Sequence, residues 1–207
     1  MNPTISPDFP LDRVPKIESM SNIDLLGVLV GRRCACDLLK DVSGSLSRLL
    51  HEPLPTLYAQ PASKLRAATE LVRRSLTEAL QHRDVLGSPG AVRDFLRVTL
   101  ARRDHEIFMV LFLDAQNRVI AWEEMFRGTL TQTSVYPREV VKRALAHNAA
   151  AVILAHNHPS GVAEPSRADE LLTRTLRDAL ALIDARVLDH FIIAGNTVVS
   201  FAERGLL

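Results

Sequence analysis

An apolar run of seven residues, followed directly by two histidines, constrains the fold of this chain more than any other segment. The run covers 149–155 and has the length and composition of a strand buried on both faces. It is followed by the sequence HNHPSG at 156–161, in which proline and glycine end the strand. We therefore expect a central strand that delivers two imidazoles to one end of a sheet.

Side chains alternate between the two sides of an extended strand, so His156 and His158 should point the same way and Asn157 the opposite way. Downstream, Pro165 and Ser166 indicate the start of a helix that carries Asp169 on its inward face. Two imidazoles on one side can bind the same metal ion, and an inward carboxylate can complete the set.

Two neutral imidazoles and one carboxylate are the protein ligands of a catalytic zinc site, in which the fourth position is left to water. A structural zinc site is usually closed by cysteine. The only cysteines here, Cys34 and Cys36, lie far from this segment in sequence, and a Cys-x-Cys pair without further ligands is a poor metal site.

Each of these residues also has an ordinary structural interpretation. An isolated His-x-His pair is more often a polar surface pair. Ser166 suits a helix N-cap, with Asp169 in the capping-box position. His190, which precedes an apolar strand, is more often a hydrogen-bonded structural residue than a site residue.

The spacing His-x-His-Pro, six residues, Ser-x-x-Asp resembles the JAMM motif of the JAB/MPN metalloproteases. More narrowly, the segments 156–161 and 165–166 resemble the RadC family of bacterial MPN-domain proteins. The similarity covers about 85–207 and includes FRGTL at 126–130, VYPREV at 135–140 and LDHFII at 188–193.

The resemblance implies an α/β fold with a mixed sheet and flanking helices, a three-layer MPN (cytidine-deaminase-like) domain. It implies one Zn²⁺ per chain, bound by His156, His158 and Asp169. It also implies that Ser166 helps to hold the water and the oxyanion of the tetrahedral intermediate.

In the JAMM pattern an upstream glutamate exchanges protons with the water that zinc makes acidic, and Glu106 matches it at the start of an apolar segment over 106–113. Glu123 and Glu124 are rivals on the next strand, after a turn at 114–117. The resemblance favours Glu106, while the rivals have the pattern of solvated hairpin residues.

Three regions are expected along the chain. Residues 1–20 contain four prolines and should form a flexible N-terminal segment. Residues 21–86 should form a small helical domain, and 87–207 the MPN/JAMM metallohydrolase domain, separated by the sequence GSPG at 87–90.

The helical domain should contain short helices over 23–30, 36–40 and 45–50 and a longer one over 63–82. The buried stripe expected on the long helix is Leu65, Ala68, Leu71, Val72, Leu76 and Leu80. In the C-terminal domain we expect helices over 91–101 and 137–147, the Asp169 helix, a hairpin starting at Glu106, the strand before His156, and strands over 187–194 and 197–201.

In RadC proteins the N-terminal region resembles a helix-hairpin-helix module, whose glycine-rich turn offers backbone N–H groups to a DNA phosphate. Here the corresponding segment 54–63 has no glycine, so a close approach of the backbone to phosphate is hard to build. We expect a degenerate module with a supporting or protein-docking role.

Composition narrows the classes further. The 207-residue chain is 47% hydrophobic, and its 25 Lys and Arg against 24 Asp and Glu give a formal charge of +1, so charge gives no case for nucleic acid as a partner. Two cysteines give no disulfide framework, and we find neither a membrane span nor a signal peptide in the sequence. These features are typical of a cytoplasmic protein, and the resemblance to the JAMM metalloproteases implies a peptide or protein substrate.

The sequence thus favours a zinc-dependent metalloprotease or isopeptidase-type hydrolase of amide bonds. Two alternatives remain open: a DNA-associated repair or anti-restriction accessory protein of RadC type, and a non-catalytic binding module that the metal stabilises.

Overall fold

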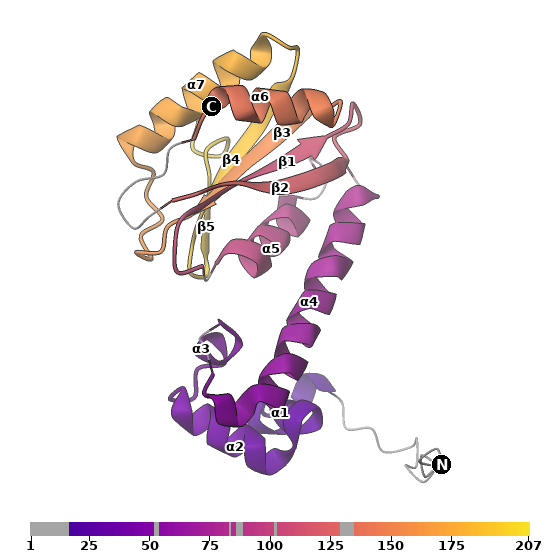
Figure 1. The fold of residues 1–207 in the computed structure, drawn as a ribbon, viewed down its shortest axis with the longest axis vertical. Helices are drawn as coiled ribbons and strands as arrows, with labels where there is room; N and C mark the ends of the chain where they lie inside the picture. Colours follow the sequence, from indigo (N-terminus) through magenta and orange to yellow (C-terminus); the bar gives the residue numbers. More distant parts are fainter. Residues whose placement is uncertain (1–16, 52–53, 83, 86–88, 102, 129–134) are drawn as a thin grey trace. The chain divides into compact units, whose positions relative to one another are not determined.

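The computed structural model describes residues 17–207 except 52–53, 83, 86–88, 102 and 129–134 (Figure 1). The chain divides into two compact units, Met1–Thr69 and Glu70–Leu207. The first is helical and the second is α/β. Most of the segment that we expected to be flexible, 1–16, lies outside the described residues, and the 3-10 helix η2 (Ile17–Ser19) follows it.

The α/β unit is built on a five-stranded mixed sheet with strand order β2-β1-β3-β4-β5. Its strands are β1 (Ile107–Leu113), β2 (Val119–Arg127), β3 (Ala151–Asn157), β4 (Arg186–Ala194) and β5 (Thr197–Ser200). Only β3 and β4 pair in parallel; the other three pairings are antiparallel. Every residue of β1 and β3 is buried, as expected for the apolar runs that supply them.

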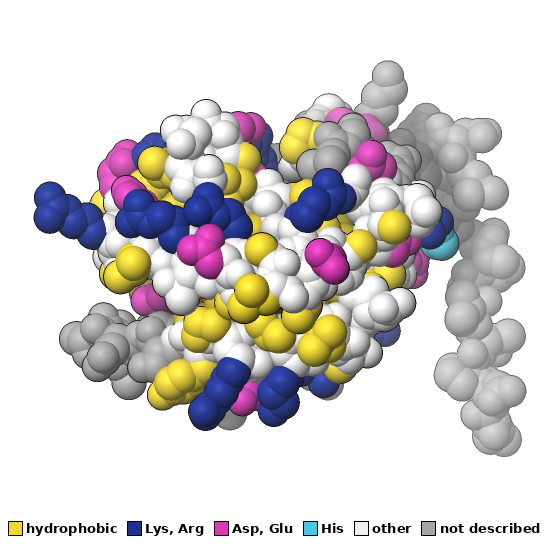
Figure 2. All heavy atoms as spheres, turned by 90° about the horizontal axis from the view of Figure 1, so that it is seen from above, with side chains coloured by type: hydrophobic (Ala, Val, Ile, Leu, Met, Phe, Trp, Pro, Cys, Tyr) yellow, Lys and Arg dark blue, Asp and Glu magenta, His cyan; other side chains and the backbone are white. Residues whose placement is uncertain are grey.

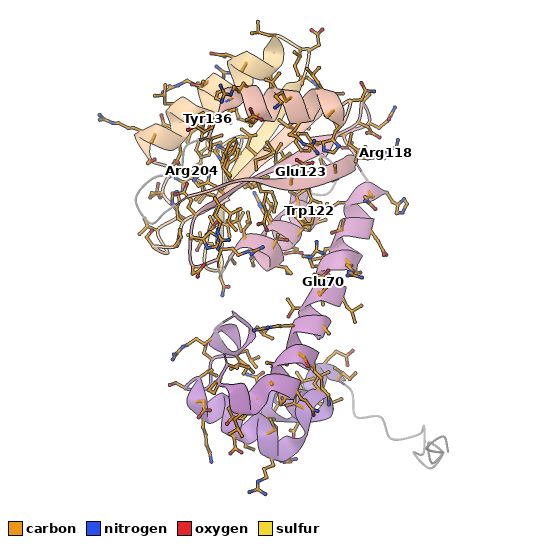
Figure 3. The ribbon with its side chains drawn as sticks, viewed as in Figure 1. Glu70, Arg118, Trp122, Glu123, Tyr136 and Arg204 are labelled. Atoms are coloured by element: carbon orange, nitrogen blue, oxygen red, sulfur yellow. The ribbon has the colours of Figure 1, made fainter. Side chains whose placement is uncertain are left out.

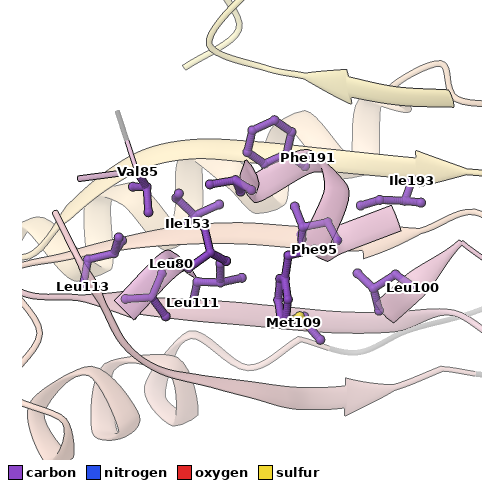
Figure 4. Close-up of a cluster of buried hydrophobic side chains, with 14 of the residues drawn as sticks. Leu80, Val85, Phe95, Leu100, Met109, Leu111, Leu113, Ile153, Phe191 and Ile193 are labelled. Carbon is purple, nitrogen blue, oxygen red and sulfur yellow. The ribbon is translucent and has the colours of Figure 1, made fainter. Parts of the chain in front are cut away.

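Three layers result, because helices cover both faces of this sheet (Figure 1). Helix α5 (Pro89–Leu100) packs on one face, where its buried Phe95, Leu96 and Leu100 join the core drawn in Figure 4. Helices α6 (Pro137–Ala146) and α7 (Arg167–Ala181) cover the other face. The mixed α/β sheet with flanking helices and the helical N-terminal region confirm the predicted fold class.

The helical unit packs short helices around its own small core. Its elements are α1 (Asn22–Val30), α2 (Arg32–Asp41), α3 (Leu46–His51), η3 (Thr56–Tyr58) and the first part of α4 (Ala59–Gln81). Ser21 caps α1 by accepting a hydrogen bond from the Asp24 N–H at 3.2 Å. Gly31, at a φ of 86°, separates α1 from α2, a conformation that glycine adopts without strain.

Helix α4 differs from the sequence prediction in two ways. It begins at Ala59 rather than Ser63, because Pro61 lies in its first turn, where a missing N–H costs no intrahelical bond. Leu71 and Val72, expected to be buried, are 67% and 52% exposed. The stripe is covered only at its ends, where Leu65 belongs to the helical core and Leu80 to the α/β core.

The sequence prediction placed the domain boundary between residues 86 and 87, whereas the two compact units divide within α4, after Thr69. The second half of α4 contributes Leu76 and Leu80 to the core beneath the sheet. None of the described helices combines the length and the apolar composition that a membrane span requires.

Candidate metal centre

The end of β3 and the start of α7 bring three potential metal ligands together. A nitrogen of each imidazole of His156 and His158 and a carboxylate oxygen of Asp169 all lie within 4.8 Å of one another. The Nε2 atoms of the two histidines are 2.9 Å apart. The Asp169 carboxylate lies 3.3 Å from His156 Nε2 and 3.6 Å from His158 Nε2. This group could hold a metal ion.

Local structure explains how the chain delivers these side chains. His156 is the penultimate residue of β3, and the chain leaves the sheet through a turn at Pro159 and Ser160, with Gly161 at a φ of 79°. Ser166 then caps α7, which places Asp169 in the first turn with its side chain 13% exposed. His156 therefore comes from a rigid strand and Asp169 from a capped helix, while His158 directly follows the strand and is held to β4 by its N–H bond to the Ile193 carbonyl at 2.8 Å.

Hydrogen bonds outside the triad orient its imidazoles. His158 Nδ1 lies 2.8 Å from the Val162 carbonyl oxygen, which can only accept, so Nδ1 carries a proton and neutral His158 presents a lone pair on Nε2. His156 Nδ1 lies 2.8 Å from Nε2 of His190, a residue that is fully buried. Burial holds the pKa of His190 well below its usual value, so this imidazole is neutral.

Asp169 is held as a carboxylate by its neighbours. Burial alone would raise its pKa, but the neighbouring imidazoles of His156 and His158 and the hydrogen bonds from Ser166 bring the pKa far below the usual range. In return, the nearby Asp169 carboxylate raises the pKa of His158, against the effect of the burial of that ring. The carboxylate thus favours positive charge at the point where the two imidazoles meet.

Ser166 makes a reciprocal capping box with Asp169. Its Oγ accepts from the Asp169 N–H at 3.1 Å, and the Asp169 Oδ2 accepts from the Ser166 N–H at 2.7 Å and from the Ser166 Oγ–H at 2.6 Å. The ordinary structural interpretation of Ser166 as an N-cap therefore applies, and the same hydroxyl borders the ligand triad.

Glu106 immediately precedes β1 and is half-buried. Its backbone carbonyl accepts from the Gly128 N–H at 2.9 Å. Phe108 pairs with His156 across β1 and β3, so Glu106 lies at the same end of the sheet as His158, and its charge is among the causes that raise the pKa of His158. The segment that carries it is fastened by Asn157, whose Oδ1 accepts from the Ile107 N–H at 2.8 Å and whose Nδ2 donates to the His105 carbonyl at 3.0 Å.

The rival glutamates are engaged elsewhere. Glu123, which Figure 3 shows on β2, accepts from Arg143 Nε at 2.7 Å and lies 2.7 Å from His147 Nε2. The hydrogen bond from Arg143 comes first among the causes that lower the pKa of Glu123 to about 2. Glu124 forms an ion pair with Arg103. Both rival carboxylates are thus held by basic side chains, whereas the charge of Glu106 acts on His158.

The donor set fits zinc. Tetrahedral zinc with bonds of about 2.0–2.1 Å places neighbouring ligand atoms about 3.3 Å apart. The observed separations of 2.9, 3.3 and 3.6 Å surround that value. The two imidazole nitrogens also face each other with their lone pairs, beside a carboxylate. These groups repel one another, and a bound cation would remove the repulsion.

The sequence did not predict that Thr173 and Asn157 support this centre. The Thr173 hydroxyl oxygen lies 2.6 Å from His190 Nδ1, and Asn157 holds the Glu106 segment. Asn157 could have been found from the sequence, because, like His190, it is a polar side chain within an apolar strand. Thr173 could not, since a threonine on a helix is common.

Comparison with known proteins agrees with this arrangement. The sequence pattern of the RadC-like JAB domain matches residues 86–206. A UPF0758 protein of Dechloromonas aromatica is 56% identical over 204 residues, covering 91% of this chain and 90% of the relative. A UPF0758 protein of Nitrosomonas eutropha is 59% identical over 170 residues, covering 79% and 76% of the two chains.

A further UPF0758 protein, from Leptothrix cholodnii, is 70% identical over 145 residues, which are 70% of this chain and 65% of the relative. The matched domain includes β1–β5, α6 and α7, and with them all three ligand residues and Glu106. The chain therefore belongs to the family of RadC-like JAB-domain proteins.

Proposed function

We propose that this protein is a zinc-dependent hydrolase that cleaves amide bonds in peptides or isopeptides. The observation that carries the proposal is the convergence of His156, His158 and Asp169 on one point, in a JAB domain whose neighbouring strand β1 begins directly after Glu106. An open three-ligand set is the mark of a catalytic rather than a structural zinc site.

Zinc supplies a Lewis acid that lowers the pKa of a water molecule and polarises a carbonyl group. The protein supplies the rest of the chemistry. Glu106 takes a proton from the attacking water and delivers it to the nitrogen of the leaving amine. The Ser166 hydroxyl, whose single proton goes to Asp169 Oδ2 in the free protein, would turn it to the oxyanion that develops on the substrate carbonyl.

The sheet offers a surface for an extended substrate. β2 is an edge strand, and it ends at Arg127, next to the Gly128 N–H that bonds the Glu106 carbonyl. An exposed strand edge binds a peptide by adding it as a further strand, with main-chain hydrogen bonds that do not depend on sequence. A peptide held there would run toward Glu106.

Substitution of Glu106 by Gln tests the assignment. We expect the wild type and Glu106→Gln each to bind one zinc per chain, and Glu106→Gln to lose roughly two to four orders of magnitude in peptide turnover, the usual contribution of a positioned acid–base group. Glu123→Gln is the matched control, because Glu123 is paired with Arg143, and it should keep its turnover. Elemental analysis and a peptide-library assay provide the two measurements.

The zinc content of variants at the proposed ligand residues tests which side chains bind the metal. His158→Ala leaves two ligands and should contain little zinc after dialysis. Full zinc occupancy of His158→Ala would remove this residue from the site. Retained turnover in Glu106→Gln together with loss in Glu123→Gln or Glu124→Gln would show that the base has been assigned to the wrong strand.

A further inference from the structure

A line of buried polar side chains runs from α7 through β4 to the candidate metal ligand on β3. Thr173, His190 and His156 are 1%, 0% and 1% exposed. The Thr173 Oγ1 lies 2.6 Å from the Asp169 carbonyl oxygen and 2.6 Å from His190 Nδ1. His190 Nε2 in turn lies 2.8 Å from His156 Nδ1.

The proton positions along this line follow from its first member. A threonine hydroxyl has one proton, and the Thr173 hydroxyl donates it to the Asp169 carbonyl. The hydroxyl oxygen then accepts from His190, which must carry its proton on Nδ1. Neutral His190 consequently has a lone pair on Nε2, and this lone pair accepts the Nδ1–H of His156.

The consequence reaches the metal centre. With its proton on Nδ1, neutral His156 presents the Nε2 lone pair toward His158 and Asp169. In the reverse order, Thr173 would donate to His190, His190 to His156, and His156 would carry its proton on Nε2, facing the metal position. Only the first order of hydrogen bonds leaves His156 Nε2 with a lone pair that can bind a metal ion.

Resting on the proposed function, we propose that His190 is a positioning residue that fixes the metal-binding tautomer of His156, and that Thr173 sets the tautomer of His190. Metal-ligating histidines usually give their second N–H to a carboxylate, a backbone carbonyl or water. Here the acceptor is a second imidazole, whose own orientation depends on a hydroxyl hydrogen-bonded to the backbone of the third ligand, Asp169.

Packing holds the His190 ring in the orientation that this role needs. The ring lies 4.8 Å from the Phe201 ring and 5.7 Å from the Phe108 ring, measured between centroids. Phe108 also stacks on His156 at 6.4 Å with an interplanar angle of 19°. A flipped His190 would place carbon atoms against both Thr173 and His156 and would lose both hydrogen bonds.

Zinc affinity of matched variants tests the proposal, measured on the full chain by competition with a chromophoric chelator. Thr173→Val removes the hydroxyl and keeps the shape, and His190→Phe removes both ring nitrogens. Each should bind zinc about 10- to 100-fold more weakly than the wild type, the usual effect of losing an outer-shell partner. Thr173→Ser keeps the hydroxyl and should stay within about threefold of the wild type. His190→Gln offers an amide donor and acceptor in place of the two ring nitrogens and should recover part of the affinity that His190→Phe loses.

Nitrogen-15 NMR of the histidine rings provides a second readout that does not depend on activity. The zinc-loaded wild type should show His190 protonated on Nδ1 only, and His156 protonated on Nδ1. A His190 protonated on Nε2 would overturn the proposal even if His190→Phe failed to fold. Wild-type affinity in both Thr173→Val and His190→Phe would overturn it as well. A wild type that binds no zinc would instead overturn the proposed function, and this inference with it.

Discussion

At the scale of single residues, Asn157 lies between two candidate ligands in sequence, but its side chain points to the opposite side of the strand and forms hydrogen bonds there. Its side chain is 2% exposed and bonds the backbone on both sides of Glu106. The alternation of side chains along β3 predicted that Asn157 would point away from His156 and His158. The partners of Asn157 could not be predicted, because they lie about fifty residues away and are determined by the β1–β3 register.

Asn157→Ala should therefore destabilise the protein and displace Glu106. The change leaves the buried Ile107 N–H and the His105 carbonyl without the Asn157 partner, which costs about 3 kcal/mol of unfolding free energy. Turnover should fall even at temperatures where the variant is folded. Chemical denaturation provides the measurement, and an unchanged unfolding midpoint would show that this side chain does not fasten the segment.

The Glu123 ion pair predicts a specific acid response. The pKa of Glu123 is lowered to about 2 by Arg143 and His147, against an ordinary value of 4.5. Because the folded-state pKa is depressed, the stabilisation is present above pH 4.5 and is lost as the pH falls toward 2. With screening of the partly exposed pair, we expect a contribution of about 1 kcal/mol.

Glu123→Gln should remove this contribution and flatten the acid limb of the stability curve between pH 4.5 and 2. Urea unfolding of the wild type and the variant across this range measures it. Parallel curves for the two proteins would mean that the ion pair adds nothing. Retained turnover in the same variant would separate this stabilising role from that of Glu106.

At the scale of elements, the site depends on one strand–turn–helix unit, β3 to α7. Its parts could be predicted because each has a local cause: an apolar run, a proline–glycine break, and a Ser-x-x-Asp start. Strand order and the burial of α4 could not be predicted, since they depend on which elements pack against one another in the folded protein. Leu71 and Val72 illustrate the point, because periodicity marks an apolar stripe but not whether anything covers it.

Ser166 is the residue in which the capping and chemical roles of this unit compete. Ser166→Ala should cost about 1 kcal/mol of stability through loss of the N-cap. Ser166→Gly should recover most of that stability, since glycine at an N-cap costs only about a few tenths of a kcal/mol, and it has no side chain to donate. If the hydroxyl stabilises the oxyanion, turnover should be about 100-fold lower in both variants.

Ser166→Thr keeps both functions and is the matched control. Turnover and unfolding free energy measured on the three variants separate the roles. Full turnover in Ser166→Gly would reduce Ser166 to a helix cap and leave oxyanion stabilisation to other groups.

At the scale of the whole molecule, charge is balanced and largely paired. On the face shown in Figure 2, Lys and Arg side chains lie among acidic, neutral and hydrophobic ones rather than in one continuous patch. Many arginines on the α/β unit are paired with carboxylates: Arg93 with Glu203, Arg97 with Asp94, Arg118 with Asp114, Arg143 with Glu123, and Arg204 with Glu164. A DNA phosphate would have to displace these partners.

We therefore predict weak, non-specific DNA binding at physiological salt. A protein that neutralises several phosphates shows a log–log slope of affinity against salt of about −0.9 per phosphate contacted. With a formal charge of +1 and paired arginines, this protein should show a shallow slope on duplex DNA, measured by fluorescence anisotropy between low and physiological salt.

The same preparation distinguishes amide hydrolysis from nucleic-acid chemistry at the metal centre. Peptide cleavage should depend on Glu106 and His156, while any DNA cleavage should be unaffected by Glu106→Gln and should disappear on further purification. Both outcomes follow if the site has evolved to protonate a leaving amine. DNA cleavage that Glu106→Gln abolishes, in protein free of contaminating nuclease, would overturn the amide-hydrolase assignment and make a nucleic acid the substrate of this site.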